Sequence, residues 1–216
     1  MNFKSHLSKF KNIIIKTLSW FIFFKKNFHK SIPIYLKNNT NGLKVHLGCG
    51  NINLQGWINV DAREFKHVHL VSDGFDLSQF KENSISEFYL CHVLEHFSFL
   101  ESEKFLKKLY DLLVPGGIIR ISVPDIEKIF ILYSEQKKLK IIKNAIMGGQ
   151  SYPNDFHKSI YDQEELKNIL EKNNFKNISS WNTEDVFGKS IGDWSDGYYK
   201  YNMKNYSISL NLVGEK

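Results

Sequence analysis

Beyond residue 42, short apolar runs alternate with longer stretches in which apolar residues recur every three or four positions. Runs of the first kind predict buried strands, and stretches of the second kind predict helices with one apolar face. The predicted strands are residues 44–47, 57–60, 67–71, 87–91, 117–123, 177–181 and 206–213, and the predicted helices are residues 101–113, 125–133, a more polar one ending near 147, and 162–173. Strands that alternate with helices in this way predict an α/β domain with a mostly parallel sheet.

Turn and linker residues mark the boundaries of these elements. The Pro-Gly-Gly turn at 115–117 ends the helix before it, and Asp125 could cap the helix that follows. The polar stretch NNTNG at 38–42 has the composition of a linker. We therefore expect a basic segment with its linker, residues 1–42, followed by one domain, residues 43–216.

Charge is distributed unevenly along the chain. Residues 1–60 contain nine lysines and no acidic residue; because the formal net charge of the whole chain is +6, residues 61–216 carry a net charge of −3. A protein that tracks nucleic acid needs a basic surface on its folded body. This body is mildly acidic, so we expect no nucleic-acid partner.

An apolar stretch, IIIKTLSWFIFF at 13–24, lies inside the basic segment. It is too short to span a bilayer, which takes about 20 apolar residues. As a helix it would have a broad apolar face beside a narrow polar stripe that includes Lys16. Such a helix could pack on its own domain or on a partner subunit, or it could lie in the plane of a membrane. Residues 1–37 could therefore make a peripheral membrane contact.

The chain has two cysteines, Cys49 and Cys91, and they are not spaced for a zinc cluster. Free thiols are typical of a reducing compartment, whereas a disulfide scaffold needs more cysteines at closer intervals. We therefore expect a cytoplasmic protein.

Residues suited to ligand binding follow five successive predicted strands. Ligands of parallel α/β sheets bind beyond the carboxyl ends of the strands. Glycines there let a ligand approach the backbone, and an aspartate can accept hydrogen bonds from both hydroxyls of a ribose. The residues at these strand ends are, in order, Gly48 and Gly50, Asp61, Asp73, Cys91 with His92, and Pro124 with Asp125. This pattern predicts a nucleoside-binding site at one edge of the sheet.

Five stretches carry a family resemblance: VHLGCG (45–50), NVD (59–61), ENSISEFYLCHVLEHF (82–97), LLVPGGIIRISVPD (112–125) and HKSIYDQEELKNILEKNNF (157–175). In this order they resemble the class I S-adenosylmethionine-dependent methyltransferases over roughly residues 43–214. The small type 11-like methyltransferases of surface-polysaccharide and lipopolysaccharide biosynthesis are the most similar group. The resemblance implies a Rossmann-like fold, with a mostly parallel seven-stranded sheet and helices on both faces. It also implies S-adenosylmethionine as the cofactor.

The resemblance assigns roles to the residues at the strand ends. Gly48 and Gly50 would lie against the methionine and ribose portions of the cofactor, and Asp61 would hold the ribose hydroxyls. Asp73 would lie near the adenine, and His92 would face the methyl sulfonium and the substrate. The remaining expected cofactor-binding residues are His46, Cys49 and Cys91.

The sequence departs from the family pattern in the first crossover. His46 stands where the family usually has an acidic residue, and Ile52 replaces a third glycine. Only residues 51–56 separate Gly50 from the next predicted strand, whereas a parallel crossover normally takes about 10–12 residues including its helix. We therefore expect a single turn or a loop there, which weakens any role for a helix dipole at the site.

The expected reaction is methyl transfer to a hydroxyl of a glycan or glycan precursor in cell-surface polysaccharide biosynthesis. In-line displacement depends on aligning the nucleophile with the methyl group, and a sugar hydroxyl also benefits from a base. The candidates for this base are His92, His96, Asp125 and His157, and we favour His157 with Asp125 assisting it. We expect a cytoplasmic enzyme that could form a homodimer, and its basic segment could bring it to the inner face of the cytoplasmic membrane.

Other functions remain open at this point. HVLEH at 92–96 matches the inverted zinc-protease signature of a zinc-dependent hydrolase, but no distal acidic ligand is identifiable and we predict no metal site. A methyltransferase acting on a nucleic-acid base would need motifs such as Asn-Pro-Pro-Tyr, which the chain lacks. A non-catalytic interaction protein with the same fold would leave the residues at the strand ends unexplained.

One aromatic stretch, GDWSDGYYKYN at 192–202, lies between the last two predicted strands. Its tryptophan and tyrosines could stack on a sugar face or form a lid. We expect a loop whose aromatic side chains pack against the domain beneath it.

Overall fold

The computed structural model describes residue 32, residues 42–73 and residues 76–216. The predicted amphipathic helix of the basic segment, and its contact with a membrane or a partner, lie outside the described residues. No helix within the described part of the chain is both long enough and apolar enough to cross a membrane.

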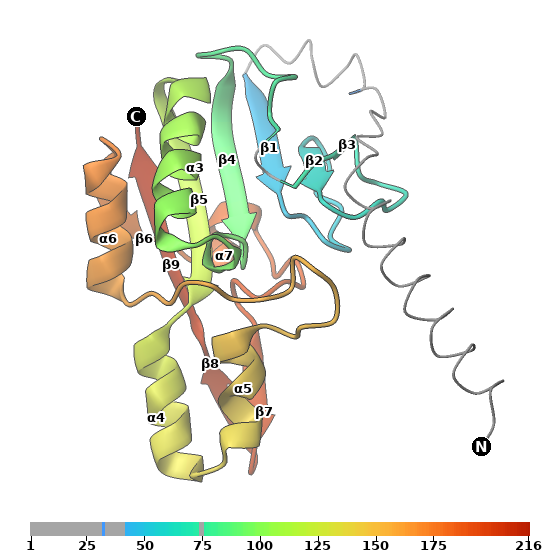
Figure 1. Ribbon diagram of the computed structural model, residues 1–216. Coiled ribbons are helices and arrows are strands. Elements are labelled where there is room, and N and C mark those ends of the chain that lie inside the picture. The colour runs from blue at the N-terminus through green and yellow to red at the C-terminus, as the bar shows by residue number, and fades with distance from the viewer. Residues whose placement is uncertain (1–31, 33–41, 74–75) are drawn as a thin grey trace, which may run out of the picture.

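A seven-stranded sheet forms the centre of the domain (Figure 1). Its strands lie in the order β3-β2-β1-β4-β5-β9-β6. The first five are parallel to one another, β9 runs antiparallel to β5, and β6 runs antiparallel to β9. The strands are β1 (Leu43–Leu47), β2 (Ile58–Asp61), β3 (Leu70–Val71), β4 (Ile85–Cys91), β5 (Leu113–Pro124), β6 (Lys176–Ser180) and β9 (Ser209–Glu215).

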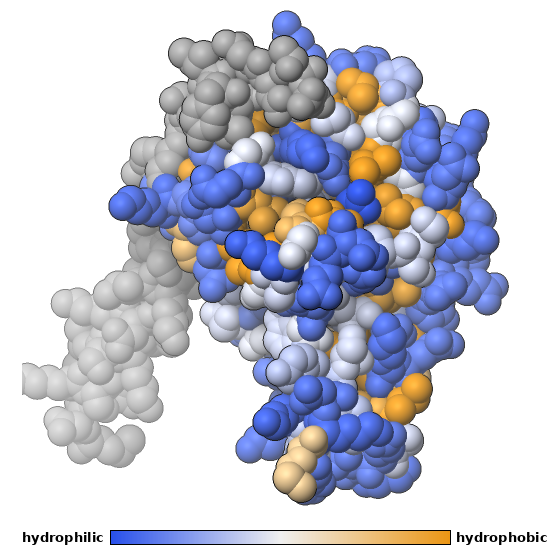
Figure 2. All heavy atoms as spheres, turned by 180° about the vertical axis from the view of Figure 1, so that it is seen from behind, coloured by the Kyte–Doolittle hydropathy of each residue, from blue (hydrophilic) through white to orange (hydrophobic). Residues whose placement is uncertain are grey.

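Helices cover both faces of this sheet. α3 (Phe99–Leu112) and α6 (Gln163–Lys172) lie on one face (Figure 1), where they bury the main apolar core against β1, β4 and β5. The opposite face carries α7 (Thr183–Phe187) and a smaller aromatic cluster around Trp57 and Tyr89. Seen from behind, this second side shows mostly hydrophilic residues with apolar ones between them (Figure 2). The predicted fold, a Rossmann-like and mostly parallel seven-stranded sheet with helices on both faces, is confirmed.

A small lobe extends beyond the carboxyl edge of the sheet (Figure 1). It consists of α4 (Ile126–Gln136), α5 (Leu139–Met147) and the antiparallel hairpin of β7 (Tyr198–Tyr201) and β8 (Lys204–Ser207). We call it the α4–β8 lobe. Its own apolar core comprises Ile129, Leu132, Ile142, Ala145, Tyr206 and Ile208. Because the lobe stands at the strand ends, it can close one side of a ligand site there.

Most predicted elements occur within a few residues of their expected bounds, but the chain after residue 192 differs. The stretch expected to be an aromatic loop contains β7, and the strand expected at 206–213 is two strands that meet at Ile208. The Ile208 carbonyl accepts a hydrogen bond from the Asp125 N–H at 2.7 Å, where the chain passes from the hairpin into the sheet. Asp125 directly follows β5 and is distant from Ile208 in sequence. The apolar pattern of residues 206–213 predicts one continuous strand, and this long-range bond lies where that strand is interrupted.

Two short elements near the strand ends were not predicted. η1 (Leu94–His96) is a single 3-10 turn after β4, and α7 is a one-turn helix after β6. The β1–β2 crossover, by contrast, is made of turns without a helix, as its length predicts.

Candidate active site

A cleft of ≈ 1060 Å³ opens between the carboxyl edge of the sheet and the α4–β8 lobe. Side chains from β1, β2, the segment after β4, residues 149–158 and residues 192–199 line it. Nine predicted site residues are among them: His46, Gly48, Cys49, Gly50, Asp61, Asp73, Cys91, His92 and His157. The structure therefore brings together in one cleft the residues that the sequence placed at separate strand ends.

The glycine turn after β1 depends on the absence of side chains. Gly48 and Gly50 have φ values of +64° and +54°, in the left-handed region that glycine adopts without strain. A Cβ on Gly48 would lie 2.3 Å from Cγ2 of Val93, which follows β4. The turn therefore packs its backbone directly against the neighbouring strand end, at the rim of the cleft.

Asp61, the last residue of β2, fastens this turn. Its side chain is buried, and its Oδ2 accepts a hydrogen bond from the Gly50 N–H at 2.7 Å. Its Oδ1 accepts hydrogen bonds from Arg63, from the backbone N–H at 2.8 Å and from Nε at 3.3 Å. The carboxylate is thus held in a defined orientation at the cleft, and Oδ2 keeps lone-pair capacity for a ligand hydroxyl.

His46 and the two cysteines are buried beside the cleft. His46 donates Nδ1–H to Asn59 Oδ1 at 3.3 Å, and burial lowers its pKa to about 4, so the ring is neutral at pH 7. Burial also raises the pKa of both thiols, to about 12 for Cys49 and well above its usual value for Cys91. These uncharged groups shape the apolar wall of the cleft, and their contact with a cofactor stays a prediction.

Arg63 and Tyr152 also line the cleft, and the sequence analysis did not predict either of them. The Arg63 guanidinium lies 4.6 Å from the ring centre of Tyr152 and 4.9 Å from that of Phe65. Arg63 and Tyr152 both line the cleft near Asp61. The position of Arg63 two residues after Asp61 is a local signal, whereas the approach of Tyr152 depends on the fold.

His92 directly follows β4 in a left-handed conformation, with φ of +52°. Ser209 Oγ donates to the Trp194 carbonyl, so it accepts the hydrogen bond from His92 Nε2–H at 2.9 Å. The ring also stacks on Trp194 with 6.0 Å between centroids. Burial, followed by the nearness of His157 and His96, lowers the His92 pKa to about 3. His92 is therefore a neutral side chain locked to β9, with Nδ1 as its free lone pair.

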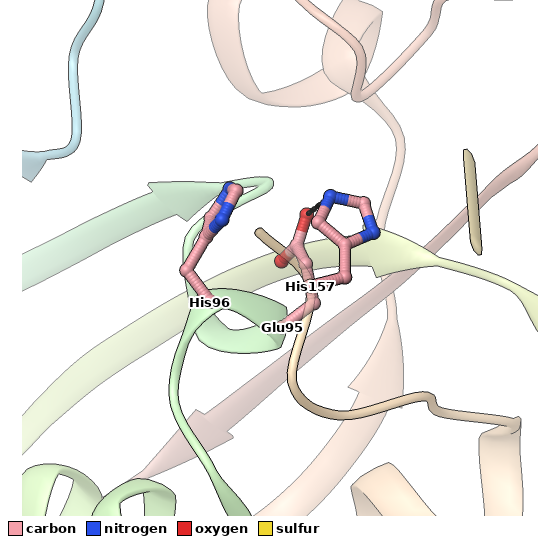
Figure 3. Close-up of side chains that lie close together, drawn as sticks. All are labelled: Glu95, His96 and His157. Carbon is pink, nitrogen blue, oxygen red and sulfur yellow. Dashed lines mark ion pairs between the residues drawn. The ribbon is translucent and has the colours of Figure 1, made fainter. Parts of the chain in front are cut away.

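Glu95, His96 and His157 form a compact cluster next to His92 (Figure 3). Glu95 and His96 come from η1, and His157 comes from the segment that precedes α6. One ligand atom from each of the three residues lies within 4.8 Å of the other two. Glu95 Oε1 lies 3.8 Å from His157 Nε2 and 3.6 Å from His92 Nδ1.

Burial dominates the electrostatics of this cluster. It raises the pKa of Glu95 to about 8 and lowers the pKa of His157 to about 4. The pKa of His96 is also lowered, chiefly by burial. The two rings are therefore neutral at pH 7, and each can offer a lone pair as a base or as a ligand.

The predicted catalytic partnership of His157 with Asp125 does not form. Asp125 is the N-cap of α4, where its Oδ1 accepts hydrogen bonds from the N–H groups of Glu127 and Lys128. Its Oδ2 lies 3.3 Å from Lys128 Nζ, and Asp125 is not among the residues that line the cleft. The carboxylate is used at the helix start because four unpaired N–H groups there need acceptors.

The zinc-protease arrangement of HVLEH is also absent. That signature needs both histidines on one face of a helix, but η1 is three residues long and His92 precedes it in a left-handed turn. His96 is grouped with the distant His157 instead. The sequence analysis considered His96 as a base candidate and, with Glu95, as part of that signature, but it did not join either residue to His157.

Comparisons with known proteins agree with this geometry. The family model for a methyltransferase domain matches residues 47–180, which is more than half of the chain. A crystal structure of a SAM-dependent methyltransferase from Archaeoglobus fulgidus is similar, with a TM-score of 0.51 and 17% sequence identity, covering 85% of this chain and 89% of that one. No curated protein matches the chain in sequence.

A second solved structure is similar to the same degree. It is the 1,6-didemethyltoxoflavin-N1-methyltransferase of Burkholderia thailandensis, with bound 1,6-didemethyltoxoflavin and S-adenosylhomocysteine. The TM-score is 0.51 and the identity is 13%, covering 81% of this chain and 71% of that one. At such identities the likeness to both structures shows the fold.

Proposed function

The chain belongs to the methyltransferase-domain family and is an S-adenosylmethionine-dependent methyltransferase, and from this premise we propose that its acceptor is a hydroxyl of a glycan or glycan precursor. The observation that carries the proposal is the single cleft, which joins a nucleoside-binding edge to an end rich in aromatic and hydrogen-bonding side chains. A sugar needs both kinds of contact, because its ring faces are apolar and its edge is polar.

The cofactor would bind along the strand ends. Asp61 is already oriented by the Gly50 and Arg63 N–H groups, and it would accept the ribose hydroxyls after displacing the longer bond from Arg63 Nε. The turn containing Gly48 would let the methionine portion pass close to the backbone. Asp73, exposed at the rim, would lie near the adenine.

The acceptor would bind between residues 149–158 and the β7 side of the lobe. Trp194 and Tyr198 line this end with exposed aromatic surface, and Tyr152 and Asp155 add polar groups. An acceptor oxygen would attack the methyl carbon in line with sulfur, and the electrons of the broken C–S bond would return to sulfur, leaving S-adenosylhomocysteine. We assign activation of the acceptor hydroxyl, which loses its proton during transfer, to the cluster around Glu95.

A labelled-methyl experiment tests the acceptor class. The full chain would be incubated with S-adenosylmethionine carrying a radiolabelled methyl group and with lipid-linked glycans or nucleotide sugars from the source cells. We expect label in an O-methyl sugar after hydrolysis and chromatography, and none with Asp61→Ala. Label in protein, nucleic acid or an amine would contradict the proposed acceptor, and cofactor binding with no transfer to any fraction would favour a non-catalytic role.

We further propose that the enzyme works at the cytoplasmic face of the membrane, where lipid-linked glycans are assembled. The support is the apolar stretch at 13–24 within residues 1–42, which contain eight lysines and no acid. We expect a membrane-bound fraction that carbonate releases and that disappears when residues 1–37 are deleted. A full-length protein found only in the soluble fraction would overturn this location, and a mass measurement in solution would test whether the chain forms a homodimer.

A further inference from the structure

The Glu95 carboxyl group is buried without the partners that such a group requires. The residue is 1% exposed, and neither carboxyl oxygen has a hydrogen-bond donor among the described residues. A buried polar group left without a partner typically costs about 1–3 kcal/mol, and more when it is charged. Such a group next to residues that line a cleft calls for an explanation, and a bound ion is one of those that native proteins provide.

The two nearby histidines each keep one ring nitrogen without a hydrogen. His96 Nδ1 lies 3.2 Å from the Phe156 carbonyl, and His157 Nδ1 lies 3.0 Å from the Ala145 carbonyl. A carbonyl oxygen can only accept, so each Nδ1 carries the hydrogen and each neutral ring has its lone pair on Nε2. A backbone carbonyl behind the ring is also the usual support of a metal-binding histidine.

The backbone holds these groups in place independently of any ligand. The Glu95 carbonyl accepts hydrogen bonds from the N–H groups of Lys158 at 2.8 Å and Ser159 at 3.1 Å. Because these residues follow His157 directly, η1 and the segment before α6 are fixed to each other. The cluster is therefore preorganised, and in Figure 3 the carboxyl of Glu95 lies between the two rings.

We propose that Glu95, His96 and His157 bind a divalent first-row transition-metal ion. Two imidazole nitrogens and one carboxylate oxygen suit zinc, iron, cobalt or manganese, whereas magnesium and calcium prefer sites built from oxygen alone. Ligand bonds of about 2.1 Å place neighbouring donor atoms roughly 3–3.5 Å apart. The 3.8 Å between Glu95 Oε1 and His157 Nε2 therefore closes with small side-chain rotations.

Three protein ligands leave coordination positions open, as in catalytic metal sites. Both histidines line the cleft, so the open positions face the space assigned to the acceptor. There the ion would bind the acceptor hydroxyl oxygen and lower its pKa, as metals do for bound water. The hydroxyl proton would leave to water in the cleft and the oxygen would take the methyl group. This role, unlike the binding itself, rests on the proposed function.

Cobalt binding to the free enzyme tests the site. Untagged full-length protein, stripped with a chelator and dialysed, would be titrated with Co²⁺ by calorimetry and visible absorption, without cofactor or acceptor. We expect one ion per chain with cobalt ligand-field bands, and competition by Zn²⁺. Glu95→Gln and His157→Asn should each weaken binding by about tenfold or more, whereas Glu103→Gln, an exposed carboxylate change on α3, should not.

Two outcomes would overturn the site: no stoichiometric binding by the wild type, or equal binding by wild type and Glu95→Gln. Circular dichroism and S-adenosylhomocysteine binding would establish that each variant is folded, and His96→Asn replaces Glu95→Gln if the latter does not fold. Normal S-adenosylhomocysteine binding without metal binding would reject the metal and leave the proposed function standing. Metal binding without S-adenosylhomocysteine binding would support the metal site and contradict the proposed function.

Discussion

The two ends of the cleft are built in different ways. The end that we propose binds the cofactor, called the cofactor end and defined by Gly48, Gly50 and Asp61, joins residues close in sequence and pairs the buried carboxylate with backbone donors. The histidine end, defined by His92, Glu95, His96 and His157, joins distant segments and leaves the Glu95 carboxyl without a donor.

The difference parallels the two tasks that we propose for these ends, cofactor binding at the first and acceptor activation at the second. The cofactor end is complete in its own hydrogen bonds, so a ligand there adds to an already stable turn. The histidine end contains unused lone pairs whose buried state is costly in the free protein. We therefore expect substitutions at the first end to act on cofactor affinity and local stability, and substitutions at the second to act on acceptor chemistry and metal binding.

The largest expected effect is that of Asp61→Ala. Removing a carboxylate that would bind two ribose hydroxyls should weaken S-adenosylhomocysteine binding by about 100-fold or more, because hydrogen bonds to charged groups contribute about 1.5–3 kcal/mol each. Calorimetric titration measures the change, and the affinity of Asp61→Asn should lie between those of the wild type and Asp61→Ala. If Asp61→Ala binds S-adenosylhomocysteine with unchanged affinity, the ribose does not bind at this end of the cleft.

Gly48→Ala should be the most destabilising single change at the cofactor end. The new Cβ would lie 2.3 Å from Val93 Cγ2 at a φ of +64°, so we expect a loss of about 2–4 kcal/mol in the free energy of unfolding. Gly188→Ala is the matched control, because its φ is +71° and nothing lies within 4 Å, and it should lose about 1 kcal/mol.

Urea unfolding would compare these variants with the wild type. Adding Val93→Ala to Gly48→Ala should restore part of the loss by removing the clashing methyl group. Equal losses in Gly48→Ala and Gly188→Ala would mean that the turn is not packed against the strand end as described.

Trp194→Ala should separate the acceptor from the cofactor. Trp194 lines the cleft with 41% of its surface exposed, so we expect the KM for the acceptor to rise by about tenfold, in line with the contribution of stacking contacts. The affinity for S-adenosylhomocysteine should stay unchanged. Met203→Ala, at an exposed position between β7 and β8, is the control and should alter neither value. Loss of both binding functions with Trp194→Ala would indicate a role in folding.

Asp125→Ala should affect stability without affecting catalysis. Loss of the N-cap of α4 should cost about 1 kcal/mol of unfolding free energy, and Asp125→Asn should recover most of it because asparagine also caps helices. Thermal unfolding and kcat would be measured on the same preparations. A tenfold fall in kcat with unchanged stability would show that Asp125 takes part in catalysis.

The last expected effect concerns pH and His46. Its pKa is lowered from 6.5 to about 4 in the folded protein, so the unfolded chain binds more protons between these values and stability falls as pH falls from 6.5 toward 4. One such group contributes a slope of up to about 1.4 kcal/mol per pH unit. His46→Gln should make the fall shallower in urea unfolding series, and an unchanged slope would show that His46 is not buried as a neutral ring.

Much of the cofactor end could be read from the sequence. The strand β1, its Gly-x-Gly turn and Asp61 lie within a short stretch, and hydrophobic runs bounded by glycine fix where parallel strands end. Even the missing helix of the first crossover followed from the number of residues available. Such features are local, so the order of residue types along the chain is sufficient to predict them.

The meeting of His157 and Ser209 with the HVLEH stretch was decided by the tertiary structure. The bond between His92 and Ser209 spans 117 positions, and His157 reaches Glu95 because the Glu95 carbonyl binds the segment that follows it. Asp125 has the same sequence signal whether it caps a helix or assists a base, and only the packing of α4 shows which it does. Residue types determined which chemistry was available to this protein. Long-range backbone hydrogen bonds and burial, which no local pattern encodes, decided which of those groups meet.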